Sequence, residues 1–246
     1  MKLLLITFVT LITLSSCAHK KSDDLVIVDP NKLYAEGLAL LEKKKYYDAS
    51  LKFGDIYFQH PGGSLTSYAE IMEAYSLYKA KKYLDAVVVI DNFISLHPAH
   101  EDKSYVLYLK CLCYFDQISD IHHDQEITRK VAEVADALIA VDPNSKYALD
   151  AKVKSDIAQS QLAGKEIYIG QYYQKLLNPV ASINRFNNVI NDYKLTDYAP
   201  EAYYRLIESY ISLGLINEAK NYQNELTSKY PDNKWTEHGK KLIRKY

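Results

Sequence analysis

The residues best suited to chemistry in this sequence are two cysteines and a pair of histidines. Cys111 and Cys113 stand two residues apart in an apolar stretch, which places them about 200° apart around a helix. They cannot form a disulfide with each other there, so we expect two small buried residues. His122 and His123 are adjacent on a polar segment, without the cysteine or carboxylate spacing of a metal site. We therefore predict a solvated loop at the histidines, no metal and no cofactor.

Motifs for catalysis and for phosphate binding are missing from the sequence. It contains no Gly-rich phosphate loop, no Gly-x-Ser-x-Gly and no His-Glu-x-x-His. The 30 Lys and Arg residues almost balance the 31 Asp and Glu residues, and the net charge is −1. Such a chain has no long-range field to attract nucleic acid. The sequence predicts a protein that is not an enzyme and does not bind nucleic acid.

Cys17 has a different setting, because it follows an apolar run that begins after Lys2. The run over residues 3–14 fits a signal peptide and is shorter than the roughly 20 residues that cross a bilayer. The string Leu-Ser-Ser-Cys that ends at Cys17 resembles the bacterial lipobox, in which the cysteine is lipidated. We expect a signal peptide over 1–16, a lipid anchor at Cys17 and a flexible tether over 17–30. The alternative is an ordinary signal peptide followed by a chance cysteine.

The elements that position these residues should be helices. Gly and Pro number 8 and 7 in 246 residues, about half of their average usage. Because both residues mark tight turns, a chain this poor in them disfavours sandwiches, barrels and propellers. The composition therefore favours an all-α fold.

A recurring spacing identifies the kind of helical fold. The string Lys-Tyr-Tyr-Asp-Ala at 45–49 recurs as Lys-Tyr-Leu-Asp-Ala at 82–86 and more weakly at 215–219. In each case the Ala precedes a Pro by twelve residues, and Val131 and Ala181 repeat the spacing toward Pro143 and Tyr193. The positions that lie twelve residues further upstream are Gly37, Ala74, Ile169 and Ile207. In the third repeat, where the spacing is longer, Cys111 takes this position. This is the tetratricopeptide (TPR) pattern, in which small residues let two helices approach and Pro ends the second one.

We predict an all-α tetratricopeptide-repeat α-solenoid of five helix pairs, about ten helices; the alternative is a generic bundle with accidental spacings. Repeats 1–3 should cover 31–143, repeats 4–5 should cover 144–231, and a helical tail should cover 232–246. Extra residues around 118–125 predict a loop in the third repeat. The Pro-free stretch 146–175 predicts one long helix, with a bend at one of its glycines.

Tyrosine is unusually frequent, with 23 Tyr against 6 Phe and 1 Trp. In a TPR solenoid the first helix of each repeat lines the concave face. The tyrosines at those positions are Tyr34, Tyr68, Tyr75, Tyr78, Tyr105 and Tyr108. They predict a groove in the first three repeats that binds an extended or helical peptide with aromatic side chains. The alternative is that some of these rings only fill the superhelix. Chaperone-tail clamps carry Lys and Asn where this chain has Tyr34 and Leu38, which argues against that kind of site.

Longer strings of this sequence resemble the BamD family, lipoproteins of the outer-membrane β-barrel assembly (BAM) machinery. The resemblance is carried by Phe-Ile-Ser-Leu-His-Pro-Ala-His at 93–100, Tyr-Val-Leu-Tyr at 105–108, Leu-Ala-Gly-Lys-Glu at 162–166, Tyr-Tyr at 172–173, Asn-Arg-Phe at 184–186, Ala-Pro-Glu-Ala at 199–202 and Tyr-Pro-Asp-Asn-Lys-Trp at 230–235. One departure is Cys111, where the family has a small Gly.

The resemblance implies a non-enzymatic scaffold that helps to assemble and insert β-barrel proteins. It also implies a lipid-anchored protein on the periplasmic side of the outer membrane of a Gram-negative bacterium. The implied partners are the barrel subunit BamA through a POTRA domain, other BAM lipoproteins, and unfolded outer-membrane proteins. The Asn-Arg-Phe match places the family's partner-facing arginine at Arg185, whereas the alternative is an Arg185 that pairs with Glu166 of its own solenoid. The runner-up function is a TPR lipoprotein scaffold in cell-envelope or peptidoglycan organisation.

Overall fold

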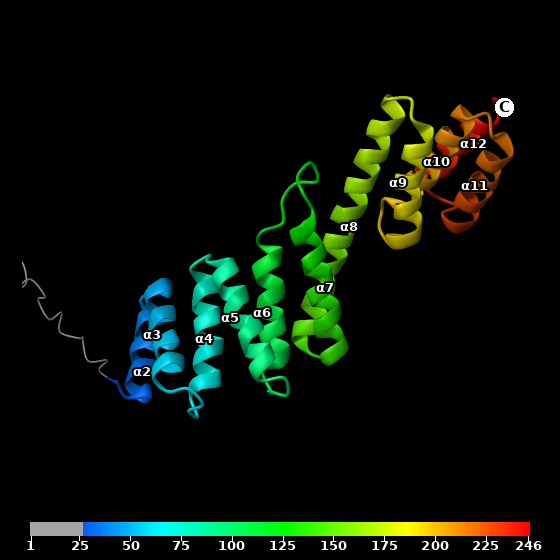
Figure 1. Ribbon diagram of the computed structural model, residues 1–246. Helices are drawn as coiled ribbons and strands as arrows, with labels where there is room; N and C mark the ends of the chain where they lie inside the picture. Colours follow the sequence, from blue (N-terminus) through cyan, green and yellow to red (C-terminus); the bar gives the residue numbers. More distant parts are fainter. Residues whose placement is uncertain (1–26) are drawn as a thin grey trace, which may run out of the picture.

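The computed structural model describes residues 27–246 as a row of helices joined by short turns (Figure 1). The predicted signal peptide, Cys17 and the tether as far as residue 26 lie outside the described residues. The eleven helices of the described part are α2 (Pro30–Glu42), α3 (Tyr46–Gln59), α4 (Thr66–Lys79), α5 (Tyr83–Leu96), α6 (Lys103–Phe115), α7 (Glu126–Val141), α8 (Lys146–Lys175), α9 (Pro179–Asp192), α10 (Ala199–Ser212), α11 (Ile216–Lys229) and α12 (Lys234–Ile243). Within residues 27–246, no helix has both the length and the apolar composition that crossing a bilayer requires.

The helices form consecutive pairs, and each pair packs mainly on the next along the chain. The pairs are α2–α3, α4–α5, α6–α7, α8–α9 and α10–α11, and α12 covers the last one. Four separate hydrophobic clusters follow one another along the row. This arrangement confirms the predicted all-α solenoid of five helix pairs, and α12 forms the predicted C-terminal helix.

The long helix and the loop of the third repeat also lie where the sequence indicated. Helix α8 runs over Lys146–Lys175, and the Ser145 side chain accepts a hydrogen bond from the Ala148 N–H at its start. The loop 116–125 joins α6 to α7 and packs back onto α8. There the Lys165 Nζ donates to the carbonyl oxygens of His122 and His123 at 3.2 and 3.1 Å.

The two candidate cysteines are buried in α6, as predicted. Burial raises the pKa of the Cys111 thiol to about 11 and that of Cys113 to about 12. Both side chains therefore stay protonated at neutral pH and act as small apolar groups.

The register of the fourth repeat differs by one residue from the predicted one. Ser182 is fully buried at the fourth position of α9, whereas Ala181 remains partly exposed. On α8 the small residue that faces α9 is Gly170, one residue after the predicted Ile169, and it lies against Phe186. A Cβ on Gly170 would lie 2.3 Å from the Phe186 ring, so only glycine fits this helix contact.

The first repeat shows the same kind of contact between a glycine and a phenylalanine ring. Comparing the two repeats explains why the predicted register was wrong by one residue. A Cβ on Gly37 would lie 2.7 Å from the ring of Phe53, and Phe53 follows the buried Ala49 by one turn. The fourth repeat lacks the Pro that ends the other second helices, and Ser182 takes the place of their small apolar residue. Ala181, the residue before Ser182, fits the twelve-residue spacing by chance.

Replacing Gly170 with Ala should lower the stability of the protein by about 1–3 kcal/mol, because the added methyl group must displace the fully buried Phe186 ring. Glycine to alanine inside a helix normally stabilises by up to about 1 kcal/mol. A loss of stability would therefore show that close packing dominates, and a gain would show that helix propensity does. Thermal unfolding followed by circular dichroism measures it, and a raised melting temperature would contradict the contact.

Helix α8 is shared between the hydrophobic clusters of the two halves of the solenoid. Ala148 and Ala158 belong to the hydrophobic cluster of the preceding repeats, and Ala163 belongs to the cluster of the following ones. In Figure 1, α8 stands beside α7 with its first half and beside α9 with its second half. One continuous helix thus joins the two halves.

The chain enters the first repeat through backbone contacts just before α2. The Val28 N–H donates to the Gln59 Oε1 at 2.8 Å, and the Val28 carbonyl oxygen lies 2.7 Å from the His60 Nε2. Val28 is therefore attached to the end of α3, and α2 begins at Pro30, one residue before the predicted repeat boundary.

Candidate functional site

A row of half-buried tyrosines crosses three first helices of the solenoid. Tyr75 lies on α4, Tyr105 and Tyr108 lie on α6, and Tyr147 lies on α8, and all four pack against one hydrophobic cluster. The Tyr147 ring centroid is 5.5 Å from that of Tyr105 and 5.3 Å from that of Tyr108. We call these four residues the tyrosine surface.

The phenol groups of the tyrosine surface are held in a partly apolar environment. Burial, reinforced by the neighbouring phenols of Tyr75 and Tyr147, raises the pKa of Tyr105 to about 12. Burial and the Asp150 carboxylate raise the pKa of Tyr108, whose hydroxyl donates to the Asp150 Oδ2 at 2.7 Å. The hydroxyls of Tyr105 and Tyr108 therefore stay protonated at neutral pH, the proton of Tyr108 is taken by Asp150 in a hydrogen bond, and the ring faces offer apolar contact.

The structure brings together only part of the predicted six-tyrosine groove. Tyr34 belongs to the cluster of the first repeat, where its ring meets the edge of Phe53 at 5.3 Å. Tyr68 is exposed at the start of α4, and its hydroxyl donates to Glu101 at 3.3 Å. Tyr78 lies at the other end of α4 beside Tyr83, at 6.0 Å between ring centroids. Tyr78 packs against the same hydrophobic cluster as the tyrosine surface, whereas Tyr34 belongs to the first-repeat cluster and Tyr68 is exposed.

Sequence analysis missed Tyr147, which contacts both tyrosines of α6. The groove was predicted for the first three repeats only, so the first turns of the long helix were not considered as part of it. In the register set by Gly170 the second position of this repeat is Gly164, so Tyr147 lies in the N-terminal extension of the long helix and the repeat pattern carried no signal for it.

Arg185 lies on α9, where it contacts α8. Its Nη1 donates to the two carboxylate oxygens of Glu166 at 3.3 and 3.4 Å, and the Asn188 Nδ2 donates to the same carboxylate at 2.9 Å. The Arg185 side chain is 38% exposed and that of Glu166 is 17% exposed. The internal pair named as the alternative is therefore present, and the guanidinium keeps an exposed side.

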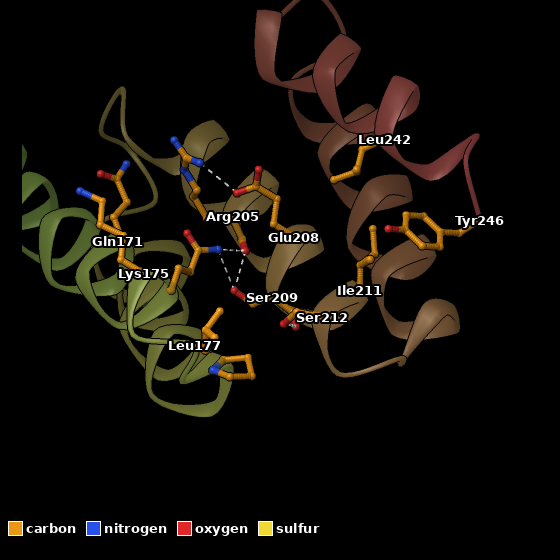
Figure 2. Close-up of a pocket in the computed structure, with 12 residues that line it drawn as sticks. Gln171, Lys175, Leu177, Arg205, Glu208, Ser209, Ile211, Ser212, Leu242 and Tyr246 are labelled. Atoms are coloured by element: carbon orange, nitrogen blue, oxygen red, sulfur yellow. Dashed lines mark hydrogen bonds and ion pairs between the residues drawn. The ribbon is translucent and has the colours of Figure 1, made fainter.

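A pocket of about 790 Å³ lies in the C-terminal half, between the end of α8, α10 and α12 (Figure 2). We call it the C-terminal pocket. Figure 2 shows Lys175 and Leu177 on one side of it, with Leu242 and Tyr246 on the other. Its lining therefore combines apolar side chains with groups that can form hydrogen bonds, which suits a side chain of another protein.

Arg205 carries the strongest interactions at the C-terminal pocket. Its guanidinium donates to Glu208 at 2.9 Å and to Glu201 at 3.2 Å, and it lies over the rings of Tyr204 and Trp235 at 5.6 and 5.4 Å. Because two carboxylates of its own helix already balance its charge, Arg205 mainly stabilises the wall of the pocket.

Comparison with known proteins gives likenesses in sequence and in fold. Residues 27–226 match the family model described as "YfiO: Outer membrane lipoprotein". The chain is 44% identical over 245 residues to a protein named outer membrane protein assembly factor BamD from Rickettsia prowazekii, covering 100% of this chain and 98% of the relative. It is 34% identical to the protein of the same name from Caulobacter vibrioides, covering 91% of this chain and 74% of the relative. A thermophilic TPR protein from Thermus thermophilus is similar with a TM-score of 0.40 and 14% identity, covering 88% of this chain and 98% of that protein.

Proposed function

Because the chain belongs to the YfiO family of outer membrane lipoproteins, we propose that it is a non-enzymatic scaffold of the BAM complex, which assembles β-barrel proteins into the outer membrane. The observation that carries the proposal is similarity over the whole chain to relatives named outer membrane protein assembly factor BamD. A row of helix pairs joined by one continuous helix supports it, because such a row presents several separate surfaces at fixed distances.

The two halves of the solenoid offer different surfaces, and we assign different partners to them. The tyrosine surface in the first half suits unfolded outer-membrane proteins whose terminal segment carries an aromatic residue, since rings pack well against rings. Arg185 and the C-terminal pocket in the second half suit a folded partner, the POTRA domain of BamA. The remaining surface leaves room for other BAM lipoproteins. Within the proposal, the scaffold faces the periplasm and a lipid holds it to the outer membrane.

Cys17 should carry the lipid anchor, because its position and the residues before it follow the lipobox pattern. Mass spectrometry of the protein purified from its native envelope should show a chain that begins at Cys17 with added acyl mass. A Cys17→Ser variant should lose that mass and leave the membrane fraction, since a single acyl chain or none gives only marginal anchoring. An intact N-terminus, or cleavage elsewhere without lipid, would contradict the proposed lipid anchor.

Co-purification separates the proposed function from its runner-up. The affinity-tagged protein, extracted from outer membrane with mild detergent, should bring down BamA in near-stoichiometric amount. A scaffold of peptidoglycan organisation would instead bring down enzymes or binding proteins of the cell wall, without BamA. The second result would replace the proposed function.

A further inference from the structure

One edge of the first two repeats carries a dense group of lysines. They lie at the turn between α2 and α3 and at the turn between α4 and α5, and we call them the lysine edge: Lys43, Lys44, Lys45, Lys79, Lys81 and Lys82. All six side chains are exposed. Within residues 27–246, none of them belongs to an ion pair, although Lys52 and Lys110 close by each do.

Aromatic side chains join the two turns into one surface. The Lys79 Nζ lies 5.7 Å from the ring centroid of Tyr46, and the Lys82 Nζ lies 5.8 Å from that of Tyr47. Tyr46 and Tyr47 directly follow the three lysines of the first turn. The second turn therefore lies against the start of α3 through Lys79 and Lys82.

The charge of the lysine edge remains clearly positive when its acidic neighbours are counted. Glu42, Asp48 and Asp85 lie within three positions of these turns in the sequence, and the Asp116 carboxylate lies beside Tyr78 and Tyr83 at the second turn. Six positive and four negative groups leave a net charge of +2, on a chain whose total is −1. Such a concentration points to a negatively charged surface as the binding partner.

Two of the lysines occupy backbone positions that favour a different residue. Lys44 and Lys81 have φ angles of 58° and 61°, in the left-handed region, whereas the equivalent turns after α8 and α10 use Leu177 at 54° and Gly214 at 74°. The turns are otherwise alike: the N–H of the next residue donates to a carbonyl five residues back, as for Lys45 to Leu40 and Lys82 to Leu77. Gly or Asn fits this conformation at lower energy than Lys. The geometry of the turn therefore does not account for the two lysines.

We propose that the lysine edge binds the anionic phospholipid headgroups of the membrane that holds the chain's own lipid anchor. Access to the membrane rests on the anchor proposed at Cys17. Cys17 and Ile27 are ten residues apart, a span of at most roughly 35 Å when extended. Helix α2 has 13 residues and is about 20 Å long, so the anchor permits the opposite end of the first repeat to reach the bilayer surface.

A membrane suits this edge better than an acidic protein for two reasons. The anchor keeps the bilayer next to the first repeat at a high effective concentration, so even weak contacts between the lysines and the headgroups form. Basic residues next to Tyr also match the interface of a bilayer, where the ammonium groups meet phosphates and the rings lie among the headgroups. Contact along this edge would fix the orientation of the first two repeats relative to the membrane.

Vesicle sedimentation tests the assignment without the anchor. The probe is the Cys17→Ser form of the mature chain with vesicles of phosphatidylethanolamine containing about one quarter phosphatidylglycerol, compared with pure phosphatidylcholine. We expect at least tenfold tighter binding to the anionic vesicles, and its loss at about 0.5 M salt, because salt screens surface charges. The Lys44→Asn/Lys81→Asn variant should bind at least tenfold more weakly, since each lysine near such a surface contributes roughly fivefold.

The matched control removes two exposed lysines elsewhere. Lys194→Gln/Lys220→Gln lowers the net charge equally and should bind within about twofold of the parent. The melting temperature of Lys44→Asn/Lys81→Asn should equal or exceed that of the parent, because Asn tolerates the left-handed conformation.

Equal binding by both variants, or equal binding to the two kinds of vesicle, would overturn the proposal. A cross-linker at position 44 that captures only an acidic protein in cells, with no vesicle binding, would make the edge a protein-docking surface instead. An absent lipid on Cys17 would appear only in the mass spectrum, so the two failures are distinguishable.

Discussion

Arg185→Leu should weaken binding of the BamA POTRA domain at least thirtyfold while lowering the melting temperature by no more than about 4 °C. Removing one side of a desolvated charge pair at an interface costs about 2–5 kcal/mol, which gives the first figure. The internal pair with Glu166 is partly exposed and contributes no more than about 1 kcal/mol, which gives the second. The guanidinium can keep its bond to Glu166 and still present its exposed side to a carboxylate of the partner.

Two matched variants show whether Arg185 acts on the partner or only within the solenoid. Glu166→Gln removes the internal carboxylate but keeps Arg185, so it should bind the POTRA domain as well as the parent. Arg205→Leu removes an arginine held by Glu201 and Glu208 and should lower the melting temperature more than Arg185→Leu does. Unchanged POTRA affinity with a large drop in melting temperature for Arg185→Leu would leave only the internal role.

Tyr105→Ala/Tyr108→Ala should weaken binding of a peptide that ends in Phe roughly tenfold. Each aromatic contact contributes about 0.5–1.5 kcal/mol beyond area burial, and the change removes two neighbouring rings of the tyrosine surface. The far-ultraviolet circular dichroism spectrum should keep its helical form, because both side chains are only half-buried. Isothermal titration calorimetry well below the melting temperature measures the change in affinity.

The control for the tyrosine surface is another pair of tyrosines one turn apart on a helix. Tyr168 and Tyr172 are exposed on the second half of α8, 21 and 25 residues after Tyr147 of the tyrosine surface, and the Tyr168 ring meets that of His122 in the third-repeat loop at 4.5 Å. Tyr168→Ala/Tyr172→Ala should leave peptide affinity within about twofold of the parent. The peptide site would lie elsewhere if both double variants bind the peptide equally well.

The spacing of small residues and prolines was enough to predict the solenoid, because steric contacts between paired helices impose it. Gly37 and Ala49 permit one close approach, and a Pro after four of the five second helices marks where that helix ends. The same rule failed by one residue at Ser182, since a polar residue there is compatible with burial once its hydroxyl bonds to the Pro179 carbonyl and the Ser209 hydroxyl. Spacing alone could not tell that residue from the neighbouring Ala181.

The candidate site was harder to predict, because it depends on contacts between repeats. A helical position shows which way Tyr105 faces, but not that Tyr147, 42 residues further on, packs against it. The division of α8 between two hydrophobic clusters was also invisible in the sequence, where the helix appears as one uninterrupted stretch. Arg185 and Glu166 could be named as a possible pair, but their exposed fractions required the structure.

Depleting the protein from growing cells tests the scaffold role most directly. The readout is the amount of folded β-barrel protein in the outer membrane, measured by its heat-modifiable migration on gels, with an inner-membrane lipoprotein as the reference. We predict that folded barrels decline and unfolded ones accumulate in the periplasm, while the reference stays constant. Folded barrels that remain at their normal level after depletion would contradict a role in barrel assembly.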